Sequence, residues 1–170
     1  MKPEDIVKAW SGKDLRRWSA QYLRDVAIPE PSKSFLIEVG LPACTDIGFK
    51  FDPLVGDPPR VAGRPHLPGI GLMNEFDLVC LDELADGRVI AVAPALQELD
   101  RSINTSVDRF AACIVLYLQW LSIADRLTPR ERAELDAQFD RDLTHMDPTV
   151  FSDPENFWAI TVWEIKEGLV

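Results

Sequence analysis

The spacing of apolar residues predicts helices at the start of the chain. Residues 4–10 and 13–25 carry apolar side chains at three- and four-residue intervals, which a helix gathers on one face. On the second segment this face consists of Leu15, Trp18 and Tyr22. A third helix is expected over 32–39. It should end at Gly40, because glycine readily adopts the left-handed conformation of a helix terminus, and Pro42 blocks any continuation.

After Asp46 the period of the apolar residues falls to two. Ile47, Phe49 and Phe51 alternate with polar residues or glycine, which is the pattern of a half-buried strand. Further strands are expected over 70–75, 76–81, 88–93 and 99–103. Asp86 and Gly87 supply a turn before the third of these segments. The middle of the chain is therefore predicted to form a meander of strands.

Residues 53–68 interrupt this run of strands with five prolines. They are Pro53, Pro58, Pro59, Pro65 and Pro68. Proline has no backbone N–H to donate to a neighbouring strand, so it is excluded from the centre of a sheet. The segment is predicted to be an exposed loop.

The segment that begins near Ser106 is the expected core helix. It has a stripe of apolar residues at helical spacing, namely Val107, Phe110, Ile114, Tyr117, Leu118 and Leu121. Its other faces are also largely apolar, so we expect neighbours to cover it on most sides over residues 106–124.

Two more helices are predicted near the end of the chain. Thr128, Pro129 and Glu131 provide an N-cap, a first helical residue and a capping-box partner. The helix that follows has a narrow apolar seam of Leu135, Phe139 and Leu143. It should therefore lie on the surface. The last helix is expected to start at Asp153-Pro154 and to end at Gly168.

The order of helices, strands and helices predicts one α+β domain over residues 1–170. Every tryptophan falls in an expected helix, and the five are Trp10, Trp18, Trp120, Trp158 and Trp163. We interpret Trp120 and Trp158 as core residues. The other three are either core residues or interface anchors, because tryptophan serves in both places.

The charge balance limits the partners. Asp and Glu number 28 against 18 Lys and Arg, which gives a net charge of −10. A polyanion such as DNA or RNA would be repelled, whereas a basic protein would be attracted. Nucleic acid is therefore not an expected partner. Acidity that serves only solubility remains the alternative.

Cysteine usage and apolar runs indicate a soluble, cytoplasmic protein without a membrane partner. Cys44, Cys80 and Cys113 lie far apart in apolar surroundings, and their odd number favours reduced thiols. The first ten residues include acidic ones where a signal peptide needs an apolar run. The longest apolar stretch, 110–118, is shorter than the roughly 20 residues that span a bilayer.

No constellation of catalytic residues stands out. His66 and His145 have no His, Cys or carboxylate partner at metal-ligand spacing. There is no activated-serine motif, and buried cysteines would have raised rather than lowered pKa values. Gly69 and Gly71 lack the third glycine and the following helix of a phosphate-binding loop. We expect no enzyme activity, no metal and no cofactor.

Two motifs give the chain a family resemblance. Residues 35–42 are FLIEVGLP, and residues 102–110 are SINTSVDRF, in which Asn104, Thr105 and Ser106 each have a side-chain oxygen able to cap a helix. The residues that match are Phe35, Leu36, Gly40, Leu41, Pro42, Asn104, Ser106 and Phe110. In this order the motifs resemble the SUKH superfamily of bacterial immunity proteins, over about residues 30–125.

The resemblance implies both a fold and a function. The fold is α+β, with a central, mainly antiparallel sheet and flanking N- and C-terminal helices. The function is to bind and neutralise a cognate polymorphic toxin, often a nuclease or nucleic-acid deaminase, without catalysis. Two alternatives stay open: a regulatory scaffold of the same superfamily, and a small-ligand protein or enzyme that uses the sheet as a pocket floor.

Carboxylates gather around the predicted strands and turns. They include Asp46, Asp52, Glu75, Asp77, Asp82, Glu83 and Asp86. One interpretation is an ordinary solvated face. Our hypothesis is a negative surface that meets a basic toxin, with Asp52, Glu75, Asp77 and Asp82 as the partner-binding residues.

Overall fold

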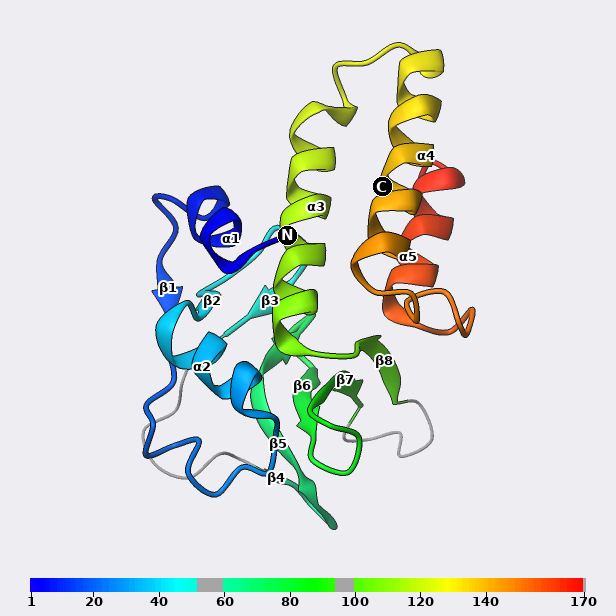
Figure 1. The fold of residues 1–170 in the computed structure, drawn as a ribbon. Helices are drawn as coiled ribbons and strands as arrows, with labels where there is room; N and C mark the ends of the chain where they lie inside the picture. Colours follow the sequence, from blue (N-terminus) through cyan, green and yellow to red (C-terminus); the bar gives the residue numbers. More distant parts are fainter. Residues whose placement is uncertain (52–59, 94–99, 170) are drawn as a thin grey trace.

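A computed structural model describes residues 1–51, 60–93 and 100–169. Its centre is an antiparallel sheet whose strands lie in the order β3 (Phe49–Lys50), β5 (Arg64–Met73), β6 (Asp77–Asp82), β7 (Arg88–Val92) and β8 (Arg101–Asn104). A further strand, β4 (Arg60–Val61), pairs with the first half of β5. Helices precede and follow the sheet (Figure 1). The predicted α+β class with flanking N- and C-terminal helices is confirmed.

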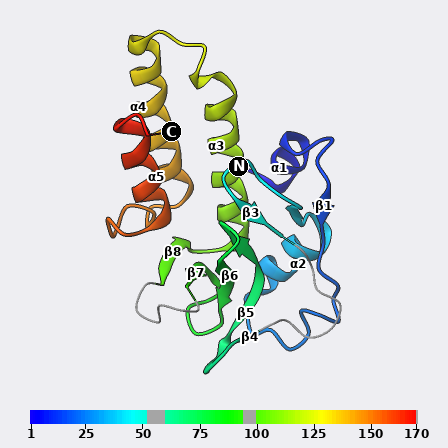
Figure 2. The same cartoon turned by 180° about the vertical axis from the view of Figure 1, so that it is seen from behind.

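The helices stand on both sides of one central helix. They are α1 (Pro3–Ala9), α2 (Glu30–Glu38), α3 (Val107–Ala124), α4 (Pro129–Met146) and α5 (Phe157–Lys166). In both views α1 and α2 lie on one side of α3, whereas α4 and α5 lie on the other (Figures 1 and 2). The C-terminal helices thus form a distinct flank of the molecule.

Both faces of the sheet are buried. Successive residues of a strand point to opposite faces. Accordingly, Val79 and Leu81 of β6 belong to the main core, while Cys80 belongs to a smaller cluster on the other face. On the main face, the ring of Phe110 from α3 meets that of Phe49 edge-on, with centroids 5.0 Å apart. The predicted core helix therefore packs on the sheet through a residue of the second motif.

The helix expected over 13–25 is wrong. A short strand, β1 (Leu15–Arg16), pairs there with β2 (Leu41–Pro42), and the Trp18 N–H donates to the Leu36 carbonyl at 3.1 Å. Trp18 and Tyr22 are buried as their spacing suggested. Their burial comes from distant backbone pairing, which a local apolar period does not distinguish from helix formation.

Gly40 ends α2 as predicted and also permits the β1–β2 pairing. Its φ is +81°, in the left-handed region. A Cβ atom at this position would lie 2.2 Å from the backbone oxygen of Arg16. Glycine is therefore required for its conformation and for the close approach of β1.

The exposed loop predicted over 53–68 is wrong in its second half. Residues 60–61 form β4, and residues 64–68 belong to β5, with Leu67 almost completely buried. Pro65 and Pro68 of β5 lie where strand pairing is irregular. The β4–β5 register shifts between Arg60 and Val61, and the β5–β6 register shifts between Gly69 and Gly71. Such irregular positions tolerate a missing N–H. Residues 52–59 lie outside the described part.

The capping box of α4 is confirmed, but α5 starts later than predicted. Glu131 N–H donates to Thr128 Oγ1, and Thr128 N–H donates back to the Glu131 carboxylate at 2.9 Å. Asp153 does not cap the last helix. Its carboxylate accepts from Glu155 N–H in a preceding turn, and α5 begins after Asn156. The polar turn residues around Asp153 form local hydrogen bonds that compete with a helix.

The tryptophans and α3 show where the core lies. Trp120 and Trp158 are buried as expected, and so are Trp10 and Trp18, whereas Trp163 is 55 % exposed. By length and composition α3 could cross a membrane, but 56 % of it is buried inside the protein. In this fold α3 is the core helix, and Trp163 is the one tryptophan that the core does not use.

Candidate functional site

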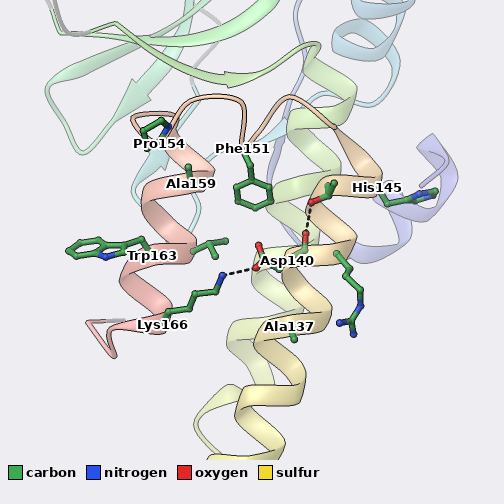
Figure 3. A pocket seen from close by; sticks show the side chains of 11 residues that line it. Ala137, Asp140, His145, Phe151, Pro154, Ala159, Trp163 and Lys166 are labelled. Atoms are coloured by element: carbon green, nitrogen blue, oxygen red, sulfur yellow. Dashed lines mark hydrogen bonds and ion pairs between the residues drawn. The ribbon is translucent and has the colours of Figure 1, made fainter.

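A groove of about 1020 Å³ lies between α4 and α5 (Figure 3). Its lining combines small, apolar and charged residues: Ala137, Asp140, Arg141, Thr144, His145, Phe151, Pro154, Ala159, Val162, Trp163 and Lys166. Ala137 of α4 and Ala159 of α5 contribute only methyl groups to this lining. Because those side chains are small, the groove has room for side chains of another molecule.

One ion pair crosses this groove. Lys166 Nζ on α5 donates to Asp140 Oδ2 on α4 at 2.6 Å (Figure 3). The Lys166 side chain is about half exposed and that of Asp140 about one third, so solvent screens the pair and its stabilising effect is small. Its consequence is electrostatic, since it neutralises the only lysine of α5.

The outer side of α5 carries an apolar and acidic ridge. We use the term α5 ridge for Ile160, Trp163, Glu164 and Glu167, which follow one another at intervals of three, one and three residues. Their spacing places them along one side of the helix, opposite the buried residues Trp158, Thr161, Val162 and Ile165. Neither Glu164 nor Glu167 forms an ion pair with another described residue. The sequence did not distinguish Trp163 from the other tryptophans, because all five fall in predicted helices.

Much of the net charge belongs to the C-terminal helices. Residues 128–170 contain ten acidic and four basic residues, a net charge of −6 out of −10 for the chain. The first 127 residues therefore contribute only −4. Acidity, which the sequence analysis assigned to the strand edges and turns, is concentrated on the α4–α5 flank.

Glu75 and Asp77, two of the proposed partner-binding residues, lie together at the turn between β5 and β6. Asn74 and Glu75 have positive φ values of 50° and 69°, and Asn74 N–H donates to the Gly48 carbonyl at 3.0 Å. Glu75 accepts from Lys50 at 2.6 Å, and this hydrogen bond lowers the pKa of the Glu75 carboxyl. Phe76 between them is 79 % exposed.

Asp82 is separate from this pair. It ends β6, five residues beyond Asp77, which at about 3.3 Å per residue is roughly 16 Å away. Its odd offset from Asp77 also points it to the opposite face of the sheet. It accepts from Leu84 N–H and lies 3.6 Å from Arg88. Asp52 is outside the described residues. The structure therefore brings together Glu75 and Asp77 but not all the proposed residues.

Glu83, another carboxylate of the predicted negative surface, already accepts hydrogen bonds from within the protein. Burial acts to raise the pKa of Glu83, but hydrogen bonds from Arg60 and from Ala27 N–H outweigh it and lower that pKa. The Arg60 guanidinium approaches Glu83 at 2.9 and 3.2 Å. This residue joins β4 to the segment before α2, which is a structural role.

A buried carboxylate joins the sheet to the C-terminal helices. Asp147, just after α4, has a fully buried side chain. Its Oδ2 accepts from Asn104 Nδ2 at 3.1 Å and from Thr105 N–H at 2.7 Å, and its Oδ1 accepts from Thr149 Oγ1 at 2.9 Å. Burial raises the pKa of Asp147, but these hydrogen bonds outweigh it and lower the pKa.

The side chains of the second motif, residues 102–110, do not cap α3 as predicted. Ser106 occupies the N-cap position of α3 without a side-chain capping bond. Asn104 and Thr105 bind Asp147 instead, and Asn104 Oδ1 accepts from Trp158 Nε1 of α5 at 2.8 Å. The motif side chains therefore tie β8 to both C-terminal helices. Sequence spacing missed this because the partners lie 43 and 54 residues away.

The cysteines and histidines form no reactive cluster among residues 1–51, 60–93 and 100–169. Burial raises the pKa of Cys80 and of Cys113 to about 12, the direction expected for inert thiols. Cys44 is exposed, so the apolar setting predicted for it is wrong. Across the same described ranges no three His, Cys, Asp or Glu side chains are arranged to hold a metal ion.

Comparison with known proteins identifies one family. The model of the SUKH-4 immunity protein family matches residues 2–164. The match extends the resemblance seen over 30–125 to both ends of the chain, including α1, α4 and most of α5. No curated protein and no solved structure matches the chain significantly.

Proposed function

Because this chain belongs to the SUKH-4 immunity protein family, we propose that it binds and neutralises a cognate bacterial polymorphic toxin. The observation that carries the proposal is the length of the family match, residues 2–164, which covers nearly the whole fold. The protein would protect the producing cell by binding, not by chemistry. Its place of action would be the cytoplasm, where nuclease and deaminase toxins meet their substrates.

We further propose that the toxin is basic and acts on nucleic acid. Proteins that act on nucleic acid are positively charged around their sites. A partner with a net charge of −10 would attract such a surface and speed its encounter. The same charge disfavours nucleic acid itself and anionic membrane surfaces as direct partners.

The experiment is co-expression of this chain with the toxin domain encoded by the gene immediately upstream. Cells that make the toxin alone should stop growing, cells that make both should grow, and the two purified proteins should elute as one complex. Growth arrest in the presence of well-folded immunity protein would contradict the proposal.

Variants distinguish binding from catalysis. His66→Ala and Cys80→Ala should each retain protection if the fold is intact, because His66 belongs to no cluster of metal-binding side chains in the described residues and Cys80 is buried. A variant with normal thermal stability and normal toxin binding but no protection would point instead to an enzyme.

A further inference from the structure

We infer that the α5 ridge and the adjoining α4–α5 groove form the toxin-binding surface, with Trp163 as its anchor; this rests on the proposed function. The expectation from sequence was a surface along the strand turns. The structure offers a stronger candidate on the flank formed by α4 and α5.

Trp163 has the properties of an interface anchor. It is the only tryptophan that the core leaves exposed, at 55 %. Tryptophan is enriched among residues that dominate binding energy, because its large flat ring contributes contact area with few rotatable bonds. In Figure 3 its ring extends outward from α5, away from α4, while the groove opens beside it.

The ridge is held rigidly before any partner arrives. Near its start, Trp158 Nε1 donates to the buried Asn104 at 2.8 Å. The buried Val162 and Ile165 fix the inner face along the rest of the helix. A surface that needs no reordering loses less entropy on binding.

The acidic residues next to Trp163 favour a basic partner. Lys166 pairs with Asp140, whereas Glu164 and Glu167 next to Trp163 form no ion pair with a described residue. Arg141 of α4 also lines the groove, and the side chain of His145 points away from α5 (Figure 3). With a net charge of −6 on residues 128–170, the flank suits a basic protein surface that presents an apolar pocket for the indole.

The test compares two exposed aromatic residues. The probe is the toxin domain encoded immediately upstream, inactivated at its catalytic centre, and its Kd is measured for the wild type, Trp163→Ala and the matched control Phe76→Ala. Trp163→Ala should weaken binding by about 30-fold or more, the range of an anchor residue. Phe76→Ala should change Kd by less than about threefold. Thermal unfolding of each variant checks that the fold is retained.

A charge variant tests the ridge even if Trp163→Ala unfolds. Glu164→Lys combined with Glu167→Lys should slow toxin association, and the difference should shrink as salt rises. If the wild type binds the toxin and both ridge variants bind equally well, the ridge is not the contact. If the wild type itself does not bind, the proposed function fails as well.

Self-association is the remaining outcome that would overturn the assignment. Sedimentation of the chain alone should show a species whose size does not change with Trp163→Ala. A dimer that this substitution dissociates would make the ridge an interface between copies of the chain.

Discussion

The side-chain amide of Asn104 donates to the buried carboxylate of Asp147 at 3.1 Å, joining the end of β8 to the end of α4. The same amide group accepts from Trp158 of α5, so one residue of the sheet positions both C-terminal helices. The α4–α5 flank, on which we place toxin binding, is attached to the fold through this contact.

Asp147→Asn should destabilise the protein by about 1.5–3 kcal/mol, because hydrogen bonds to a charged group are stronger than neutral ones and the new amide cannot accept from all the present donors. The lowered pKa of Asp147 also sets a pH dependence. Its contribution is complete above the ordinary carboxyl pKa of about 3.9 and is lost as pH falls toward the lower folded value. Urea unfolding from pH 7 down to pH 3 measures both effects, and the variant should lose less stability over that range. Parallel curves for the two proteins would contradict this role.

Gly40→Ala should destabilise the protein more than Gly12→Ala. Both glycines have left-handed φ values, +81° and +84°, so an alanine is strained at either position. Only at Gly40 would the new Cβ meet backbone, at 2.2 Å from the Arg16 oxygen, whereas nothing lies within 4 Å at Gly12. We expect about 1 kcal/mol at Gly12 and at least about twice that at Gly40. Equal midpoints in thermal unfolding would show that the β1–β2 approach is not tight.

Ile114→Ala should cost about 2–5 kcal/mol, because it leaves a cavity in the packed core around α3. Ile123→Ala on the same helix is the matched control, since that side chain is 43 % exposed and its loss should cost much less. Chemical denaturation compares the two. A denaturation midpoint of Ile114→Ala that does not move would exclude α3 as the core helix.

The acidic residues proposed from sequence give a prediction that competes with the α5 ridge. Changing Asp52, Glu75 and Asp77 together to Lys should slow toxin association if the strand turns are the contact, and the effect should shrink at high salt. Asp82→Lys is tested separately, because Asp82 lies on the opposite face of the sheet. Since solvent screens each exposed charge, single changes would be hard to detect. Surface plasmon resonance measures the rates, and an unchanged association rate excludes this surface.

Local signals account for the elements that were correctly predicted. The capping box of Thr128 and Glu131, the helix end at Gly40 and the alternation around Phe49 each depend on residues within about four positions of one another. Such short-range interactions are present in the chain before it folds. The two family motifs, at residues 35–42 and 102–110, are each compact as well, and the family resemblance followed from the pair.

Residues with distant partners were assigned wrongly. Leu15 and Arg16 became a strand because residues 41–42 were available to pair, and β5 accommodated prolines because β4 and β6 shift register beside them. Asn104 and Thr105 bind Asp147 rather than the helix they precede. In each case the partner that decides the structure is distant in the sequence, so only the folded chain brings the two together.

By itself, the sequence determined an acidic α+β chain with a core helix predicted over 106–124, a capped surface helix after Thr128 and two motifs that resemble those of immunity proteins. The tertiary structure alone decided which tryptophan stays in solvent, which lysine is neutralised and which carboxylate holds the C-terminal flank. The physical reason is that burial and charge pairing depend on the other residues that folding brings near Trp163, Lys166 and Asp147, and not on their neighbours in the chain.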